Sequence, residues 1–155
     1  MRFDERDRKI LSILLKGSAT PKAQIARQVG LAASAVSDRI RRLEESGIVK
    51  NYEARLDAKA LGVPLLAFIF VQERKPNDGY DTAGALAQVT GAEEVHKIAG
   101  EDCFLVKLRA AGTEELGAVL DREINLIPTV TGVRTTIVLK SVLEGPPLSG
   151  MTLDR

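Results

Sequence analysis

The stretch ATPKAQIARQVGLAASAVSDRIRRLEESGIVK, residues 19–50, decides the fold of the N-terminal part of the chain. It predicts two short helices joined by a tight turn. The first helix is expected to have Thr20 as its N-cap and Pro21 at its first position, where a missing N–H group has no intrahelical partner to lose. Gly30 can adopt the left-handed conformation that ends a helix, and Leu31 is expected to fill the turn as a buried residue.

Apolar spacing orients both helices of this stretch. The apolar residues of the first helix fall on one face within residues 25–29. In the second helix, Val36, Ile40 and Leu43 recur at intervals of four and three, so they share a face that turns inward. The residues left on the outer face are polar or charged: Ser34, Ser37, Asp38, Arg41 and Arg42.

Two short helices, a tight turn and outward arginines are typical of a helix-turn-helix, which indicates DNA binding. The alternative is a helical hairpin whose charged face is merely solvated. Residues 1–50 contain eleven Lys or Arg and six Asp or Glu, a net charge of +5, whereas the rest of the chain contains eleven and fifteen, a net charge of −4. The whole-chain charge of +1 conceals this split. The split favours DNA, because only the N-terminal part suits a polyphosphate.

The composition argues against several other classes of protein. One cysteine, Cys103, cannot form an internal disulfide, and with His96 as the only histidine no cysteine–histidine zinc site is expected. No glycine-rich phosphate loop and no nucleophile with a histidine partner is recognisable, so we expect no enzyme, no metal and no cofactor. Cys103 is interpreted as a small core residue, with a redox sensor as the alternative. His96 is interpreted as a surface or interface residue.

Membrane and export signals are not recognisable in the sequence. No apolar run approaches the roughly 20 residues that a membrane helix needs. The beginning of the chain, MRFDERDRKI, carries charges where a signal peptide would be apolar. We therefore expect a soluble, cytoplasmic protein with no membrane partner.

The hydrophobic pattern changes near residue 50. Before it, a further helix over residues 4–16, with Phe3 among its apolar residues and Gly17 ending it, is expected to pack on the two helices already described. After it, apolar and β-branched runs alternate with helical segments. The predicted order is strand, helix, strand, strand, helix, strand, over residues 65–72, 81–89, 94–98, 103–108, 114–127 and 130–142. Thr113 is expected to cap the helix over residues 114–127, and Pro128 is expected to stop it. The last strand is expected to bend at Gly132.

This order is that of a split-βαβ, ferredoxin-like domain, so the expected fold class is α+β. This order divides the chain into four parts. Residues 1–50 form a helix-turn-helix (winged-helix-like) DNA-binding domain, and residues 51–62 form a linker strand. Residues 63–144 form a ferredoxin-like effector-binding and oligomerisation domain, and residues 145–155 form a loosely ordered tail.

The first strand of this domain, LLAFIFVQ over residues 65–72, is apolar on both faces. A ferredoxin-like sheet has helices on one face only, so something else must cover the other face. A second copy of the domain is the simplest candidate, and we predict a homodimer through the sheets. A two-fold dimer also suits a pseudo-palindromic DNA site.

A series of residues recurs in a fixed order along nearly the whole chain: Asp4, Asp7, Arg8, Ile10, Leu11, Ile25-Ala26, Val29-Gly30-Leu31, Val36, Arg39, Ile40, Arg42, Leu43, Glu44, Gly47-Ile48, Tyr52, Leu56, Asp57, Leu61-Gly62, Gly100, Phe104, Leu105, Pro128, Val130, Arg134-Thr135 and Ile137-Val138-Leu139. In this series the chain resembles the Lrp/AsnC (leucine-responsive, feast/famine) family of transcriptional regulators. The resemblance implies that the C-terminal (RAM/ACT-like) half binds amino acids or related effectors between subunits and assembles dimers into octamers or similar rings.

Two departures from the family pattern stand out. Ala32 and Ala35 occupy places where the family usually has Ser and often Pro, so Ser34 is a candidate for a later helix cap. The acid of the family's Gly-x-x-Asp pattern would fall at Cys103, and Asp102 comes one place early. Alternation along a strand would point Asp102 to the other face unless the turn is rearranged.

The DNA-binding roles divide by chemistry. Long cations suit phosphates and short polar groups suit base edges. Asp38 has an alternative as an ion-pair partner of Arg41 or Arg42. Arg39 either pairs with Asp4 or Asp7 or contacts DNA. The predicted phosphate contacts are Lys22, Arg27, Arg41 and Arg42, and the predicted base-edge contacts are Ser34, Ser37 and Asp38.

For the effector, the turn Gly100-Glu101-Asp102 offers backbone N–H groups and carboxylates that could hold a zwitterion, although Gly100 also fits a plain hairpin turn. Thr135 and Thr136 would add hydroxyl groups, and their assignment to the effector site rests mostly on the resemblance. We therefore expect a sequence-specific transcriptional regulator that responds to an amino acid or related effector. The alternative is an architectural, DNA-wrapping protein without an effector response.

Overall fold

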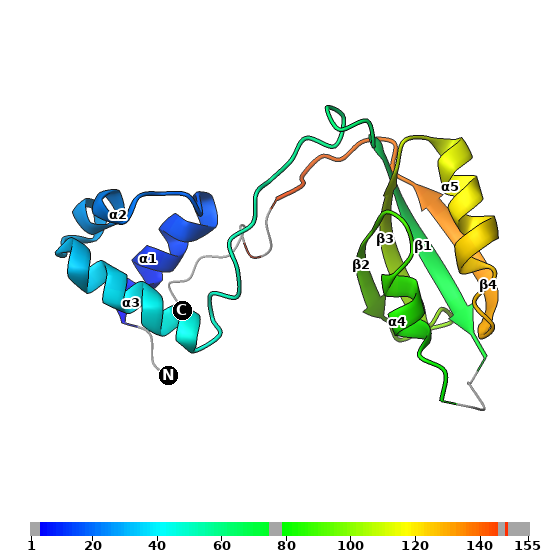
Figure 1. Ribbon diagram of the computed structural model, residues 1–155, viewed down its shortest axis with the longest axis horizontal. Helices are drawn as coiled ribbons and strands as arrows, with labels where there is room; N and C mark the ends of the chain where they lie inside the picture. The colour runs from blue at the N-terminus through cyan, green and yellow to red at the C-terminus, as the bar shows by residue number, and fades with distance from the viewer. Residues whose placement is uncertain (1–3, 75–78, 146–147, 149–155) are drawn as a thin grey trace. The chain divides into compact units, whose positions relative to one another are not determined.

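The computed structural model describes residues 4–74, 79–145 and 148. The chain divides into two compact units at Arg55/Leu56, inside the segment expected to link two domains, and residues 143–145 group with the first unit. The first unit is helical and the second contains a four-stranded sheet (Figure 1). This α+β arrangement confirms the expected fold class.

The first unit consists of α1 (Glu5–Lys16), α2 (Lys22–Val29) and α3 (Ala33–Glu45). Asp4 caps α1 and exchanges backbone and side-chain hydrogen bonds with Asp7 in a capping box. Gly17 follows the last turn of α1, as expected. Phe3, expected on this helix, lies outside the described residues. The apolar faces of the three helices form one buried cluster: Ile10, Ile25, Ala26, Val29, Val36, Ile40 and Leu43.

The turn between α2 and α3 follows the prediction, because Gly30 is left-handed with φ 66° and the Leu31 N–H donates to the Ala26 carbonyl at 3.1 Å. Leu31 is half-buried rather than fully buried. The predicted N-cap of α2 is wrong. The Thr20 hydroxyl donates back to the Gly17 carbonyl at 2.7 Å, so Pro21 takes the N-cap position.

The start of α3 also differs from the expectation. The helix begins at Ala33 after Ala32, whose side chain cannot form a cap, and Ser34 already lies inside the first turn. The Val36 N–H donates to the Ala32 carbonyl at 3.1 Å, which fixes the earlier start. Ser34 is therefore not the cap, and its hydroxyl remains exposed.

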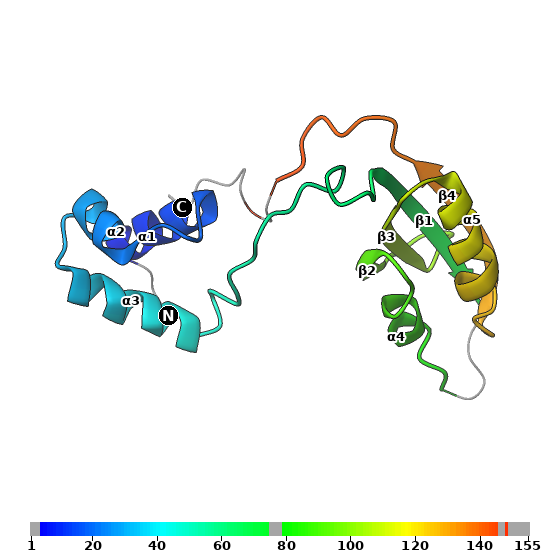
Figure 2. The ribbon, with the colours of Figure 1, turned by 45° about the horizontal axis from the view of Figure 1, so that its top comes forward.

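The second unit contains one antiparallel sheet in the order β2-β3-β1-β4, which is the ferredoxin-like order. Buried residues of both helical segments pack with one face of β1 and β3, so the helices cover that face (Figures 1 and 2). None of the described helices of this unit packs on the opposite face, here called the open face. The elements are β1 (Leu65–Glu73), α4 (Thr82–Ala87), β2 (Ala92–Lys97), β3 (Phe104–Ala110), α5 (Thr113–Val119), the π-helical turn η1 (Leu120–Ile124) and β4 (Val130–Ile137).

The second helical segment is displaced from its prediction. It begins at Thr113 with Gly112 as the N-cap, and the Gly112 carbonyl accepts from the Leu116 N–H at 3.1 Å, so Thr113 is not the cap. The segment ends at Ile124, three residues earlier than predicted, and its last turn is the π-helical η1.

The last strand is shorter than predicted, and its pairing is irregular next to Gly132, where a bend was expected. The β1–β4 register shifts between Gln72, which faces Gly132, and Glu73, which faces Val130. The Val138 N–H donates to the Leu66 carbonyl at 2.9 Å. Because β1 begins at Leu65, the chain beyond this bond has no strand to pair with, and β4 does not continue to residue 142.

The expected linker strand over residues 51–62 is absent from the described structure. A turn occupies its second half instead, with the Val63 N–H donating to the Ala58 carbonyl at 2.9 Å and the Lys59 N–H to Asp57 Oδ1 at 2.8 Å. No described strand lies alongside this segment to supply backbone partners. The predicted loose tail, 145–155, lies outside the described residues apart from Gly145 and Leu148.

Candidate functional sites

The outer face of α3 presents the arginines that the sequence singled out. Arg41 lies between Asp38 and Glu45, with N–O distances of 3.4 Å to each, and all three side chains are more than half exposed. Exposed pairs of this kind contribute little to stability and can exchange one partner for another. Arg42 is exposed, and no partner contacts it among the residues that the structure describes. The face therefore carries two cations that a phosphate could reach.

The other predicted DNA-binding residues differ in their exposure and in their hydrogen-bond partners. Ser37 is half-buried at the flank of α3, and its Oγ donates to the Ala33 carbonyl at 3.0 Å. Asp38 has Arg41 as its partner, which confirms the ion-pair interpretation in the free protein. Lys22 and Arg27 lie exposed on α2. Arg27 Nε donates only to its own helix, at 3.4 Å from the Ala23 carbonyl.

Arg39 has a structural role and does not lie on the outer face of α3. Its Nη1 lies 2.6 Å from Asp4 Oδ2 and 2.7 Å from Asp7 Oδ1. These hydrogen bonds, first with Asp7 and then with Asp4, raise the pKa of Arg39. The Asp7 backbone N–H, followed by Arg39, lowers the pKa of Asp4. Arg39 therefore joins α3 to the N-terminus of α1.

The turn between β2 and β3 contains three of the predicted effector residues, Gly100, Glu101 and Asp102. Gly100 has φ 140°, a conformation that side chains disfavour, and Glu101 is exposed. Asp102 Oδ2 accepts from Arg134 Nη2 at 2.8 Å, and the Arg134 guanidinium stacks 3.8 Å from the centroid of the Phe70 ring. The carboxylate of Asp102 is thus held on the open face of the sheet.

The structure separates the two predicted threonines. Thr135 pairs with Ile69, which belongs to the core under the helices, whereas Thr136 pairs with Phe68 on the open face. Adjacent residues of a strand point to opposite faces. Only Thr136 therefore shares a face with Asp102.

Cys103 and Asp102 are directed to different environments, although both precede β3 and strand alternation therefore does not apply to them. The Cys103 N–H donates to the Val71 carbonyl at 2.9 Å, and its Sγ lies 3.8 Å from the Glu73 carbonyl oxygen. The thiol lines a cavity on the helix-covered side, whereas Asp102 bonds to Arg134.

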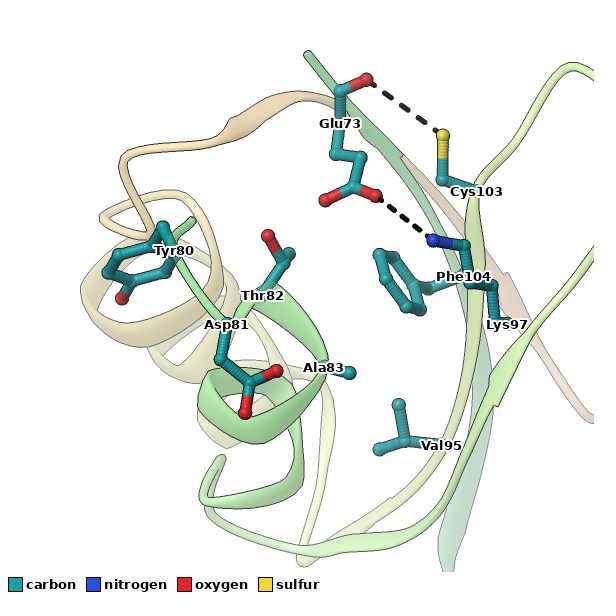
Figure 3. A pocket seen from close by; sticks show the side chains of 9 residues that line it. All are labelled: Glu73, Tyr80, Asp81, Thr82, Ala83, Val95, Lys97, Cys103 and Phe104. Atoms are coloured by element: carbon teal, nitrogen blue, oxygen red, sulfur yellow. Dashed lines mark hydrogen bonds and ion pairs between the residues drawn. The ribbon is translucent and has the colours of Figure 1, made fainter. Parts of the chain in front are cut away.

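That cavity has a volume of about 640 Å³ and lies between α4 and the ends of β1, β2 and β3 (Figure 3). The predictions from sequence missed it. The available signals were Glu73 and Lys97, charged residues placed where strands end. The lining residues are Glu73, Tyr80, Asp81, Thr82, Ala83, Val95, Lys97, Cys103 and Phe104.

A charged cluster lies on the open face along β2 and β3. Lys107 Nζ is 3.1 Å from Glu93 and 3.0 Å from Glu94, and His96 Nε2 is 3.0 Å from Glu94. Hydrogen bonds from His96 and then Lys107 lower the pKa of Glu94. Partial burial lowers the pKa of Lys107, but the bonds to Glu94 and Glu93 outweigh it and raise the pKa. His96 is exposed, as expected for a surface residue.

Two family models cover most of the chain. Residues 3–50 match "Winged helix-turn-helix DNA-binding" and residues 66–148 match "Lrp/AsnC ligand binding domain". Within the described residues, no helix is long and apolar enough to cross a membrane, and no group of three or more His, Cys, Asp or Glu could hold a metal ion.

Two named relatives match over nearly the full length of the chain. The HTH-type transcriptional regulator FL11 of Pyrococcus horikoshii is 41% identical and the match covers 92% of this chain and 93% of FL11. LrpA of Mycobacterium tuberculosis is 32% identical, with 90% and 91% covered. A solved structure of the M. tuberculosis feast or famine regulatory protein complexed with L-methionine is 30% identical with a TM-score of 0.85, and the match covers 92% of this chain and 96% of that one.

These relatives are transcriptional regulators, which confirms the expectation that the chain is not an enzyme. Its two halves match the DNA-binding and ligand-binding parts of such proteins. The chain belongs to the Lrp/AsnC family of transcriptional regulators.

Proposed function

We propose that this regulator binds DNA sequence-specifically through α3 and that an amino acid bound by the ferredoxin-like unit changes its DNA binding. The observation that carries the proposal is the outer face of α3, where Arg41 and Arg42 are exposed on a helix anchored by Arg39. The likeness to a regulator solved with L-methionine supports an amino acid as the effector class.

The proposed DNA contacts follow the exposure of each side chain. Arg41, Arg42, Lys22 and Arg27 contact phosphates, because long cations on exposed helices reach the backbone. Base edges are read by Ser34, Ser37 and Asp38, with Asp38 accepting from cytosine N4 once Arg41 turns to a phosphate.

The proposed effector region includes Gly100, Glu101, Asp102, Thr135 and Thr136. The turn offers backbone N–H groups and leads directly into Cys103, which lines the cavity on the helix-covered side. The pairing of Asp102 with Arg134 limits its part, because an incoming ammonium would have to displace a bond of 2.8 Å.

The proposed assembly is a homodimer through the open faces of two sheets, with dimers joining into a ring such as an octamer. Phe68 and Phe70 are half-buried on the open face, and a second sheet would remove their exposed area from water. Two copies related by a two-fold axis would present two α3 helices to one pseudo-palindromic site. A regulator of this kind acts where the DNA is, so we assign it to the cytoplasm.

A nuclease footprint on the DNA upstream of its own gene tests the proposal. The footprint is recorded at one moderate salt concentration, with and without the twenty amino acids. We expect protection that recurs at about one helical turn and shifts with amino acids. Protection that ignores amino acids would support architectural DNA wrapping instead, and no protection here or in genome-wide binding would contradict regulation.

A further inference from the structure

We propose that Tyr52 and Glu44 restrict the spacing of the two DNA half-sites that a dimer of this regulator accepts. The Tyr52 hydroxyl fastens the beginning of the linker, residues 51–62, to α3, so the linker leaves the helical unit in a fixed direction. This inference rests on the proposed DNA binding by α3 and on the proposed dimer. Both residues are positioning residues, which act through α3 and need no contact with DNA.

The chain is tied to the helical unit directly after α3. Gly47 is left-handed with φ 73°, which reverses the chain at the end of the helix. The Ile48 and Val49 N–H groups donate to the Leu43 carbonyl at 3.1 and 3.2 Å, and the Val49 side chain packs against the buried cluster. Beyond Val49, residues 50–56 form no backbone hydrogen bond within the described structure. Their direction therefore depends on side chains.

Tyr52 supplies the one side-chain hydrogen bond that joins this stretch to α3 within the described residues. Its hydroxyl donates to Glu44 Oε1 at 2.7 Å. Burial and then the bond to Glu44 raise the pKa of Tyr52 to about 12, so the hydroxyl keeps its proton and remains a donor at neutral pH. Its neighbours bond to each other instead, with Asn51 Nδ2 donating to Glu53 Oε1 at 2.7 Å.

The bond is compatible with DNA on the outer face of α3. At 100° per residue, Glu44 lies on a flank of the helix, between the buried face that contains Leu43 and the outer face that contains Arg41. Arg41 pairs with other carboxylates of α3 and not with Glu44. Tyr52 therefore reaches α3 from the side and leaves both outward arginines accessible to phosphate.

The bond shortens the part of the linker that can turn. Without it the chain is held as far as Val49, and with it as far as Tyr52, three residues later. Three extended residues span about 10 Å, which corresponds to about three base pairs of DNA at about 3.4 Å each. Each copy in a dimer contributes one such bond. Two fastened linkers therefore allow the two α3 helices fewer separations than two unfastened ones.

Binding of the full chain to duplexes with two half-sites tests this inference. The half-sites come from the footprint, and their spacing increases by one base pair at a time. We expect Tyr52→Phe to lower the affinity ratio between the best spacing and one longer by three base pairs about three- to tenfold. Its affinity for a single half-site should stay within about twofold of the wild type. Fluorescence anisotropy measures both, and circular dichroism confirms the fold.

Further variants show whether the bond itself is responsible. Glu44→Ala removes the acceptor and should act like Tyr52→Phe, whereas Glu44→Gln keeps an amide oxygen that can accept and should retain most of the spacing preference. The double variant with Tyr52→Phe and Glu44→Ala should lose no more than either single variant, because both remove the same bond. Glu53→Ala is the matched control, since Glu53 is a linker carboxylate that bonds only to Asn51 in the described structure.

Three outcomes would overturn the inference and leave the proposed DNA binding intact. The first is a wild type that binds half-sites without any preference for spacing. The second is a Tyr52→Phe variant that keeps the wild-type preference. The third is a Tyr52→Phe variant whose affinity for a single half-site falls as much as its spacing preference, which would show a purely structural role. If the wild type binds no DNA, the proposed function fails as well.

Discussion

Three arginines within four positions of one helix have different roles because their side chains leave the helix in different directions. Arg39 points toward α1 and is held by Asp4 and Asp7. Arg41 and Arg42 point away from the core, which Val36, Ile40 and Leu43 define. Residue type alone is therefore a poor guide to DNA contact, and angular position on the helix decides it.

Replacing Arg39 with methionine tests its structural role. Asp7 is 6% exposed, and the substitution leaves this buried carboxylate without its cation. We expect the free energy of unfolding of the helical unit to fall by about 2 kcal/mol, less than for a fully buried pair because Arg39 is partly exposed. Urea denaturation followed by circular dichroism measures it. Arg41→Met is the matched control, and an equal loss there would contradict the assigned role.

The same variant should change the response to acid. The folded-state pKa of Asp4 is lowered below 3.8, so its stabilising effect is complete above that pH and is lost as pH falls through the folded value. Without Arg39 the lowering is smaller. The unfolding free energy of Arg39→Met should therefore decline less steeply than that of the wild type as the pH is lowered from about 4. Parallel curves would show that Arg39 does not act on Asp4.

At the scale of the element, α3 carries two exposed cations suited to DNA, and carboxylates of the same helix pair with one of them. Asp38 and Glu45 neutralise Arg41 in the free protein, whereas Arg42 has no such neighbour in the described structure. Phosphate must compete with two carboxylates for Arg41 but not for Arg42. The helix thus contributes fewer free cations than its sequence indicates.

Changing Arg41 and Arg42 together to alanine should weaken binding to all DNA sequences. Phosphate contacts carry no sequence information, and each releases counterions, so the slope of log K against log salt should decrease by up to about two units. Fluorescence anisotropy over a salt series, on specific and random duplexes, measures it. Ser34→Ala serves as the control that should affect specific DNA more than the slope. An unchanged slope would remove both arginines from the phosphate contacts.

At the scale of the whole molecule, the sheet has one face covered by its own helices and one open face. Phe68, Phe70 and Leu105 lie on the open face beside the charged pairs of Lys107 and Arg109. An apolar centre with a charged border is typical of a surface that pairs with another protein. The proposed two-fold assembly uses this surface.

Substituting Phe68 with glutamate should convert the proposed dimer to a monomer. Two such carboxylates would be buried in one interface, which costs more than the lost apolar contact. Sedimentation velocity measures the mass, and circular dichroism checks the fold. Leu126→Glu is the control, because Leu126 is already 70% exposed and lies outside the sheet. A folded Phe68→Glu variant that keeps the wild-type mass would contradict the interface.

The sequence alone determined the helix-turn-helix, the order of strands and helices and the ferredoxin-like pattern, because apolar period, glycine turns and charge distribution act over a few residues. It misplaced caps at Thr20 and Thr113, where a neighbouring turn or carbonyl took the hydrogen bond instead. It also extended the last strand too far, because strand length depends on where the partner strand ends.

Only the tertiary structure decided which residues meet. Strand pairing placed Thr135 and Thr136 on opposite faces, joined Asp102 to Arg134, and brought Glu73 and Lys97 from separate strands to one cavity. Packing of α3 against α1 assigned Arg39 to Asp4 and Asp7. These contacts join residues far apart in the chain, and their register follows from the pairing of whole elements, which no local pattern specifies.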